Sequence, residues 1–145
     1  MEKRKMSFKK EDVRINEMIN SVLDSILKNI GGEIYIVGSY ATNEVTSIRI
    51  SDSQFFISDL DVMVFVNLST YLKNYIFNIS WKLSRSLTYI LRLRGLKTGV
   101  SISVISPVVA RLFPFLKPNS IYLYEMRKAL KTPDGWVLLP NSHQI

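Results

Sequence analysis

Apolar residues recur at steps of three and four positions over residues 11–32, and this spacing predicts an amphipathic helix. Gly31 and Gly32 are expected to end this helix, because glycine readily adopts the left-handed conformation that closes many helices. The same spacing over residues 70–94 predicts a second long helix. Its expected buried stripe consists of Leu72, Ile76, Ile79, Leu83, Leu87, Ile90 and Leu91.

Short apolar runs bounded by turn residues separate the helical patterns and predict strands. These runs are residues 33–37, 59–66, 100–106 and 136–140. Residues 40–58 predict a short helix from Tyr40, followed by a hairpin. A last helix is predicted over residues 121–132, with Asn119 or Ser120 as its cap. Together these elements predict an α/β (α+β) fold in which helices flank a small mixed sheet.

The composition indicates one domain of ordinary size. The chain has 145 residues, of which 47% are apolar, so a hydrophobic core can form. We expect a basic arm over residues 1–12 and a single domain over residues 13–145. The absence of cysteine excludes a disulfide framework, a thiolate metal site and a cysteine nucleophile. Neither a secretory signal nor an apolar run of roughly 20 residues is found, so we expect a soluble, cytoplasmic protein without membrane contact.

The formal net charge of +7 favours an anionic partner, such as a nucleotide, a nucleic acid or an acidic protein face. Five basic residues lie within the first ten positions, however, and a basic arm adds charge without forming a site. A nucleic-acid-binding module is less favoured, because the basic residues are scattered and no stretch of stacking aromatic residues accompanies them. The sequence leaves the oligomeric state open, with a homo-oligomer as one option.

Asp59 and Asp61 open the apolar run 59–66 and carry the sharpest chemical signal. Side chains two residues apart on a strand point to the same face, so the two carboxylates are expected to meet. They repel each other and resist burial unless a cation or hydrogen-bond donors satisfy them. Mg²⁺ is the natural cation, because it takes hard oxygen ligands and bridges to substrate phosphates. The alternative is an exposed strand end with two solvated aspartates.

Gly38 and Ser39 follow the apolar run 33–37 and precede the short predicted helix. Gly38 lacks a Cβ atom, so the backbone can bend sharply there and approach a ligand. Ser39 offers a hydroxyl, and the start of a helix offers N–H groups suited to a phosphate. Gly-Ser alone is equally typical of an ordinary turn. A strand, a Gly-Ser turn and a second strand that opens with Asp-X-Asp form a much rarer combination.

This combination resembles the nucleotidyltransferase superfamily that includes DNA polymerase beta, in its minimal stand-alone form. The matching positions are Gly38, Ser39, Asp59 and Asp61. Small members often read Gly-Ser-Tyr-Ala-Arg-Gly-Glu, and GSYATNE keeps all of these except that Thr42 and Asn43 replace Arg and Gly. Residues 115–140 are also similar to the closing helix, turn and short strand of that family. The resemblance covers most of the chain from about Ile34 onward.

The resemblance implies an activity in which a nucleoside monophosphate is transferred from a nucleoside triphosphate to a hydroxyl acceptor. ATP is the expected donor. Asp59 and Asp61 would hold Mg²⁺ ions, and Gly38 and Ser39 would hold the β- and γ-phosphates. Small members often pair with a separate, mostly helical protein as a toxin–antitoxin system. The resemblance therefore makes such a partner protein one candidate acceptor.

Two features depart from the family pattern. The spacer over residues 40–58 is longer than is typical, which a surface hairpin can accommodate at low cost in stability. The third carboxylate of the family is missing, because Ser101 or Ser103 occupies its place and no acid lies between Asp61 and Glu125. Serine is a weak, neutral magnesium ligand and a poor base. A catalytically impaired domain that binds a nucleotide or a protein is therefore the alternative to an active transferase.

Overall fold

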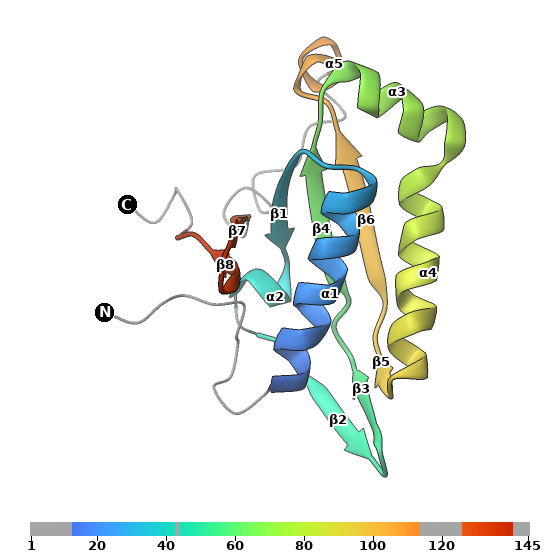
Figure 1. Ribbon diagram of the computed structural model, residues 1–145, viewed down its shortest axis with the longest axis vertical. Helices are drawn as coiled ribbons and strands as arrows, with labels where there is room; N and C mark the ends of the chain where they lie inside the picture. The colour runs from blue at the N-terminus through green and yellow to red at the C-terminus, as the bar shows by residue number, and fades with distance from the viewer. Residues whose placement is uncertain (1–12, 43, 114–125, 141–145) are drawn as a thin grey trace.

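Two β-sheets form the centre of the computed structural model, which describes residues 13–42, 44–113 and 126–140 (Figure 1). The larger sheet contains β1 (Glu33–Val37), β4 (Leu60–Phe65), β6 (Val100–Ile105), β7 (Arg127–Thr132) and β8 (Gly135–Leu138). The smaller sheet contains β2 (Ser47–Ile50), β3 (Ser53–Phe56) and β5 (Leu96–Lys97). The strand orders are β6–β4–β1–β7–β8 and β2–β3–β5. β4 and β6 run parallel, and the other neighbouring pairs of the larger sheet are antiparallel.

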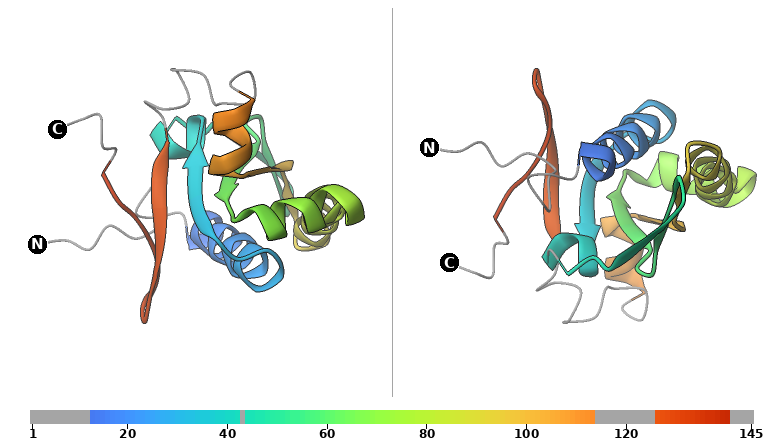
Figure 2. Two further views of the ribbon diagram at one scale, coloured as in Figure 1. Left: turned by 90° about the horizontal axis from the view of Figure 1, so that it is seen from above. Right: turned by 90° about the horizontal axis from the view of Figure 1, so that it is seen from below.

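Helices flank the larger sheet, so the predicted fold class is confirmed (Figure 2). The helices are α1 (Val13–Asn29), α2 (Ser39–Thr42), α3 (Leu68–Phe77), α4 (Ile79–Leu93) and α5 (Pro107–Leu112). Helices α1 and α4 lie on one face of the sheet and enclose the core, whereas α5 lies on the other face. Within the described residues, none of the helices is sufficiently long and apolar to cross a membrane.

The alternation of side chains along β1 and β4 separates the core face of the sheet from its opposite face. Ile36 and Val62 are paired in the sheet and buried in the core with α1. Their neighbours Val37 and Asp61 are also paired, and they therefore point to the face opposite α1 and α4. The candidate chemistry lies on this opposite face.

The hairpin predicted within residues 40–58 is confirmed as β2 and β3, which form the smaller sheet together with β5. β3 leads into β4, and β5 leads into β6, so the parallel β4–β6 pair continues as the parallel β3–β5 pair. At the junction, the amide of Leu60 donates a hydrogen bond to the carbonyl oxygen of Gly99 (2.9 Å). The second strand of the spacer, β3, therefore leads into the core strand β4 and pairs with the segment that leads into β6.

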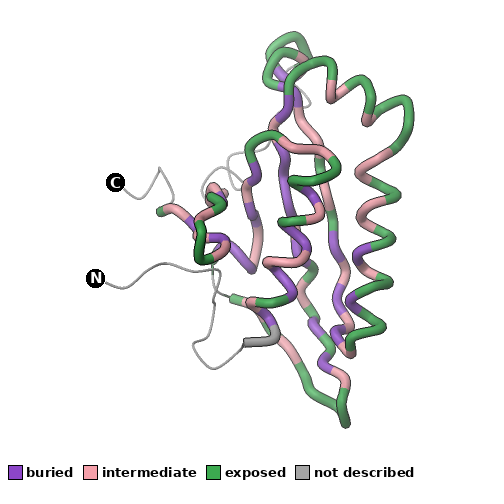
Figure 3. The backbone as a smooth tube through the Cα atoms, in the orientation of Figure 1, coloured by how far each residue is buried: buried purple, intermediate pink, exposed green. Residues whose placement is uncertain are grey.

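The single helix predicted over residues 70–94 is wrong, because Asn78 divides it into α3 and α4. Asn78 adopts a left-handed conformation (φ 56°, ψ 43°), which asparagine tolerates better than most residues. The side chain of Asn74 then accepts a hydrogen bond from the amide of Ser80 (2.6 Å) in the first turn of α4. Ile76, which was expected to be buried, is 70% exposed, and α3 buries none of its residues (Figure 3). Of the predicted stripe, Leu72 and Ile90 are also exposed, whereas Leu87 and Leu91 are buried.

The helix predicted over residues 121–132 is also wrong where the structure describes it, because residues 127–132 form strand β7. β7 pairs with β1 on one side and with β8 on the other, and this pairing overrides the local helical pattern. Residues 119–125, with the expected caps Asn119 and Ser120, lie outside the described residues, as does the basic arm over residues 1–12.

Polar side chains of α1 fasten the β7–β8 hairpin to the core. Asn20 accepts a hydrogen bond from the amide of Trp136 (3.1 Å), and Asp24 accepts one from its indole N–H (2.8 Å). Lys131 also donates to Asp24 (2.8 Å). The hydrogen bond from Lys131, followed by that from Trp136, lowers the pKa of Asp24 against the opposing effect of its partial burial.

We predict that Gly32→Ala destabilises the fold more than Gly31→Ala. Both glycines have a positive φ, near 80°, so an alanine at either position costs about 1 kcal/mol of backbone strain. A methyl group at Gly32 would lie 2.5 Å from the carbonyl oxygen of Phe65, whereas nothing lies closer than 4.0 Å at Gly31. This overlap should cost roughly 1–3 kcal/mol more. Urea unfolding followed by circular dichroism measures both losses, and equal losses would contradict the prediction.

Candidate functional site

The pairing of β1 with β4 brings the two halves of the predicted site together. Val37 is opposite Asp61 in the register, so Gly38 leaves the sheet directly beside that aspartate. Gly38 has φ +75°, and a methyl group there would lie 3.1 Å from Oδ2 of Asp61. A side chain at Gly38 would therefore be strained and would crowd the carboxylate. The expected contact between the Gly-Ser turn and the Asp-X-Asp strand is present.

Asp59 and Asp61 differ in their surroundings, because Asp59 lies just before β4 whereas Asp61 is its second residue and follows the buried Leu60. Asp59 is exposed, whereas Asp61 is half-buried next to the Gly38 turn. Burial raises the pKa of Asp61, and the negative charge of Asp59 raises it further. Ionisation of Asp61 is therefore disfavoured when no cation is bound. A cation at this position would relieve both effects.

Ser39 is the first residue of α2, a single helical turn that the rest of the fold holds in place. Tyr40 and Ala41 anchor this turn in the core, where their exposed fractions are 0% and 2%. Arg127 donates from Nη1 to the carbonyl oxygen of Ala41 (3.2 Å) and from Nε to that of Leu139 (3.1 Å). Arg127 thus connects α2 to the β7–β8 hairpin, a positioning role that the sequence did not reveal.

Gly99 is a second residue that sequence reasoning missed. It lies between β5 and β6, and a methyl group there would be 2.7 Å from Oδ1 of Asp59. The absence of a side chain at Gly99 therefore leaves the space that the Asp59 carboxylate fills. A glycine between two strand-forming runs often marks such a close approach, and this was the available signal. The carboxylate pair is thus bordered by a glycine on each side, Gly38 directly after β1 and Gly99 directly before β6.

Of the two serines expected at the place of a third carboxylate, Ser101 lies beside the candidate site. In the parallel β4–β6 pair, Ser101 is the register partner of Asp61, whereas Ser103 is the partner of Met63. Among the acids outside the pair, Glu44 is exposed after α2, and Glu125 lies outside the described residues. In the described ranges, no group of three acidic, histidine or cysteine side chains could hold a metal ion.

The two carboxylates nevertheless fit a magnesium ion by the chemistry of their donor atoms. They supply hard oxygen ligands, and a bound cation would offset both the burial of Asp61 and its repulsion by Asp59. Mg²⁺ commonly uses one or two carboxylates and completes its coordination with water and substrate phosphates. The donor set in the described residues suits one such ion.

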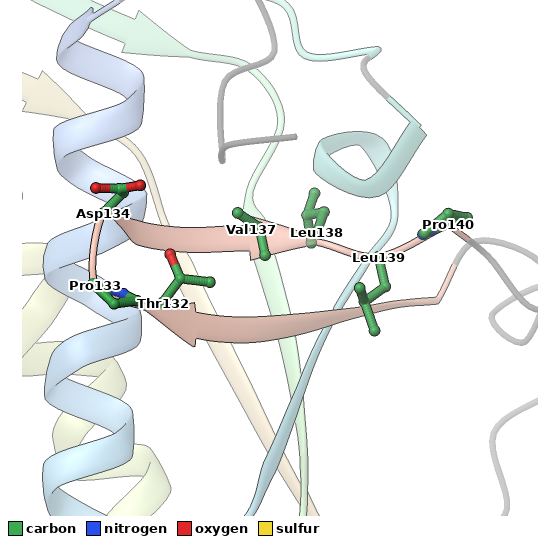
Figure 4. A pocket seen from close by; sticks show the side chains of 7 residues that line it. All are labelled: Thr132, Pro133, Asp134, Val137, Leu138, Leu139 and Pro140. Atoms are coloured by element: carbon green, nitrogen blue, oxygen red, sulfur yellow. The ribbon is translucent and has the colours of Figure 1, made fainter. Parts of the chain in front are cut away.

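A separate pocket of about 470 Å³ lies along the β7–β8 hairpin (Figure 4). Its lining consists mainly of apolar side chains from Val137 to Pro140, together with Thr132, Pro133 and Asp134 at the turn. None of the four predicted site residues lines it, and Asp134 is exposed between β7 and β8. This pocket is not part of the candidate site.

Comparisons with protein-family models, curated proteins and solved structures gave no match for this chain. The likeness to the nucleotidyltransferase superfamily therefore stays a prediction that rests on the residues themselves.

We predict that Asp61→Asn stabilises the protein at neutral pH in the absence of divalent cations. The folded state holds the Asp61 proton more tightly than the unfolded state does, because the folded pKa is raised above 3.8. The wild type therefore loses stability as pH rises from that value through the raised pKa, and the variant avoids this loss. Thermal unfolding of both proteins between pH 3 and 8 would measure the difference, which should grow with pH. A difference that is constant with pH would contradict it.

Proposed function

We propose that this chain is a magnesium-dependent nucleotidyltransferase that transfers a nucleoside monophosphate from a nucleoside triphosphate, most simply ATP, to a hydroxyl acceptor. The observation that carries this proposal is the register of β1 and β4, which sets Gly38 against the Asp61 carboxylate. A turn without a side chain and two neighbouring carboxylates suit a bound metal–triphosphate complex. The acceptor is either a small molecule or a hydroxyl side chain of a partner protein.

Each residue of the site has a defined task under this proposal. Asp59 and Asp61 would hold the metal ion, which when bound neutralises charge on the phosphates. Gly38 leaves room for phosphate oxygens beside Asp61, and Ser39 would donate its hydroxyl to one of them. Arg127 keeps α2, and with it Ser39, in position. The chain thus contributes chiefly orientation and electrostatic stabilisation, the effects on which phosphoryl and nucleotidyl transfer depend.

We predict that Asp59→Asn and Asp61→Asn each lower nucleotide transfer at least about 100-fold, because each removes a charged metal ligand. The assay would follow incorporation of label from α-labelled ATP in the presence of Mg²⁺ and a panel of hydroxyl acceptors. Asp52→Asn is the matched control, since Asp52 is exposed at the tip of the β2–β3 hairpin. Transfer that survives in both site variants would contradict the proposal.

A second candidate function is a catalytically impaired domain that binds a nucleotide or a protein. Ser101 favours it, because this neutral hydroxyl stands beside Asp61 where an acid would assist the reaction. The outer face of α3 also favours it, because Leu72, Tyr75 and Ile76 form an apolar stripe with exposed fractions of 47%, 78% and 70%. Such a stripe suits contact with another protein.

We predict that Ser101→Asp distinguishes the two candidates. A third carboxylate beside Asp61 should tighten Mg²⁺ binding and lower thermal stability without the metal, because like charges then crowd one site. If the missing acid alone limits catalysis, transfer should rise about tenfold or more. Ser103→Asp is the control, since Ser103 is paired with Met63. Tighter metal binding without any transfer would favour the binding module.

A further inference from the structure

A groove of about 680 Å³ lies where the end of α4 meets the β3–β5 pair. Its lining comes from Phe55 and Phe56 of β3, Thr88 and Arg92 of α4, and residues 97–99. The predicted hairpin supplies one wall, so the long spacer forms part of a concave surface. The spacer therefore contributes to a groove beside the candidate site.

The groove combines aromatic rings with positive charge. Phe55 is 39% exposed and is the register partner of Lys97 in the β3–β5 pair, which sets a ring next to a cation. Arg92 adds a second cation from α4, and no carboxylate is among the lining residues. The Asp59 carboxylate lies against Gly99 at the border of the groove and is not part of its lining. The groove is thus suited to an anion that also carries a planar ring.

The two threonine hydroxyls of the groove already have partners in the backbone. Thr88 donates to the carbonyl oxygen of Ser84 (2.9 Å) and accepts from the amide of Val100 (3.2 Å). Thr98 lies within hydrogen-bond distance of the carbonyl oxygens of Ser58 (3.4 Å) and Gly99 (3.3 Å). The aromatic rings and the two cations are therefore the main groups that can bind a ligand.

The groove lies next to the Asp59 carboxylate of the candidate site. Gly99 lines the groove and also lies against the Asp59 carboxylate. The Gly-Ser turn lies on the other side of the carboxylate pair, next to Asp61. Since β4 lies between β1 and β6, the Gly-Ser turn and the groove border the carboxylate pair from opposite sides.

We propose that this groove binds the acceptor, and that the acceptor is a nucleoside phosphate; this inference rests on the proposed function. Its base would stack on Phe55, its phosphate would contact Arg92 and Lys97, and a ribose hydroxyl would face Asp59. That hydroxyl oxygen forms a bond to the α-phosphorus of the donor triphosphate. The bond from the α-phosphorus to the bridging oxygen breaks, pyrophosphate leaves, and the hydroxyl proton passes to water. A nucleoside phosphate supplies the ring, the anion and the nucleophile in one unit.

Binding measured without metal tests the groove independently of catalysis. The probes are adenosine monophosphate and a three-nucleotide RNA with a free 3′ end, titrated by calorimetry in the presence of a chelator. Phe55→Ala should weaken binding roughly fivefold or more through loss of stacking. Arg92→Gln and Lys97→Gln should each weaken binding and reduce its dependence on salt concentration, because each removes a positive charge that attracts the phosphate. Lys82→Gln, an exposed cation of α4 outside the groove lining, should leave binding unchanged.

The two probes separate the sources of this ligand. Tighter binding of the mononucleotide would identify a free nucleotide as the acceptor, and tighter binding of the RNA would identify a strand end. Binding that is the same in Phe55→Ala and in wild type would overturn the groove proposal, whether or not transfer occurs. Label transferred instead to a tyrosine of an acidic peptide, with no effect of Phe55→Ala, would also overturn it.

Asp61→Asn separates failure of the groove from failure of the proposed function. This variant should bind both probes as the wild type does while losing transfer from labelled ATP. In a transfer assay, Phe55→Ala should raise KM for the nucleoside phosphate while KM for ATP is unchanged. Groove-dependent binding without any transfer by the wild type would overturn the proposed function and with it the acceptor role.

Discussion

The antiparallel pairing of β1 with β4 is the constraint on which both the core and the candidate site depend. Its register buries Ile36 and Val62 beneath α1 and, one residue further on, sets Val37 opposite Asp61. A shift of one residue would turn the buried set to the other face of the sheet. It would also move the Gly38 turn away from the carboxylate. The hydrophobic requirement of the core therefore fixes the geometry of the polar site.

The same geometry creates an unfavourable electrostatic environment for the Asp61 carboxylate. Asp61 is half-buried beside the exposed Asp59, so both burial and the neighbouring charge oppose its ionisation. Asp24 shows the contrast, because Lys131 and Trp136 satisfy its carboxylate and lower its pKa. The protein thus compensates the aspartate that fastens its hairpin and leaves the aspartate at the candidate site uncompensated. Such a difference is typical of functional positions.

The sequence predicted the parts of this fold whose local and long-range preferences agree. The strands at residues 33–37 and 59–66 and the Gly-Ser turn were foreseen, because apolar runs and glycine define them locally. Two helices were mispredicted for different reasons. The helix over residues 70–94 is interrupted at Asn78, where the backbone is left-handed. Residues 127–132 form a strand instead of a helix, because they pair with β1. Gly99 and Arg127 escaped notice because their partners, Asp59 and Ala41, are distant in sequence. Contacts of that kind become visible only in the folded chain.

The long spacer is an ordered part of the fold, because its β2–β3 hairpin belongs to the smaller sheet. As a surface loop it would be free to vary, but β3 continues into β4 and pairs with β5, which continues into β6. Its Phe55 therefore stands at a fixed register relative to Lys97, and Gly99 joins this segment to the carboxylate of Asp59. Rigid strands position side chains more precisely than loops do. The same parallel ribbon that carries the carboxylate pair thus also shapes the aromatic and basic groove beside it.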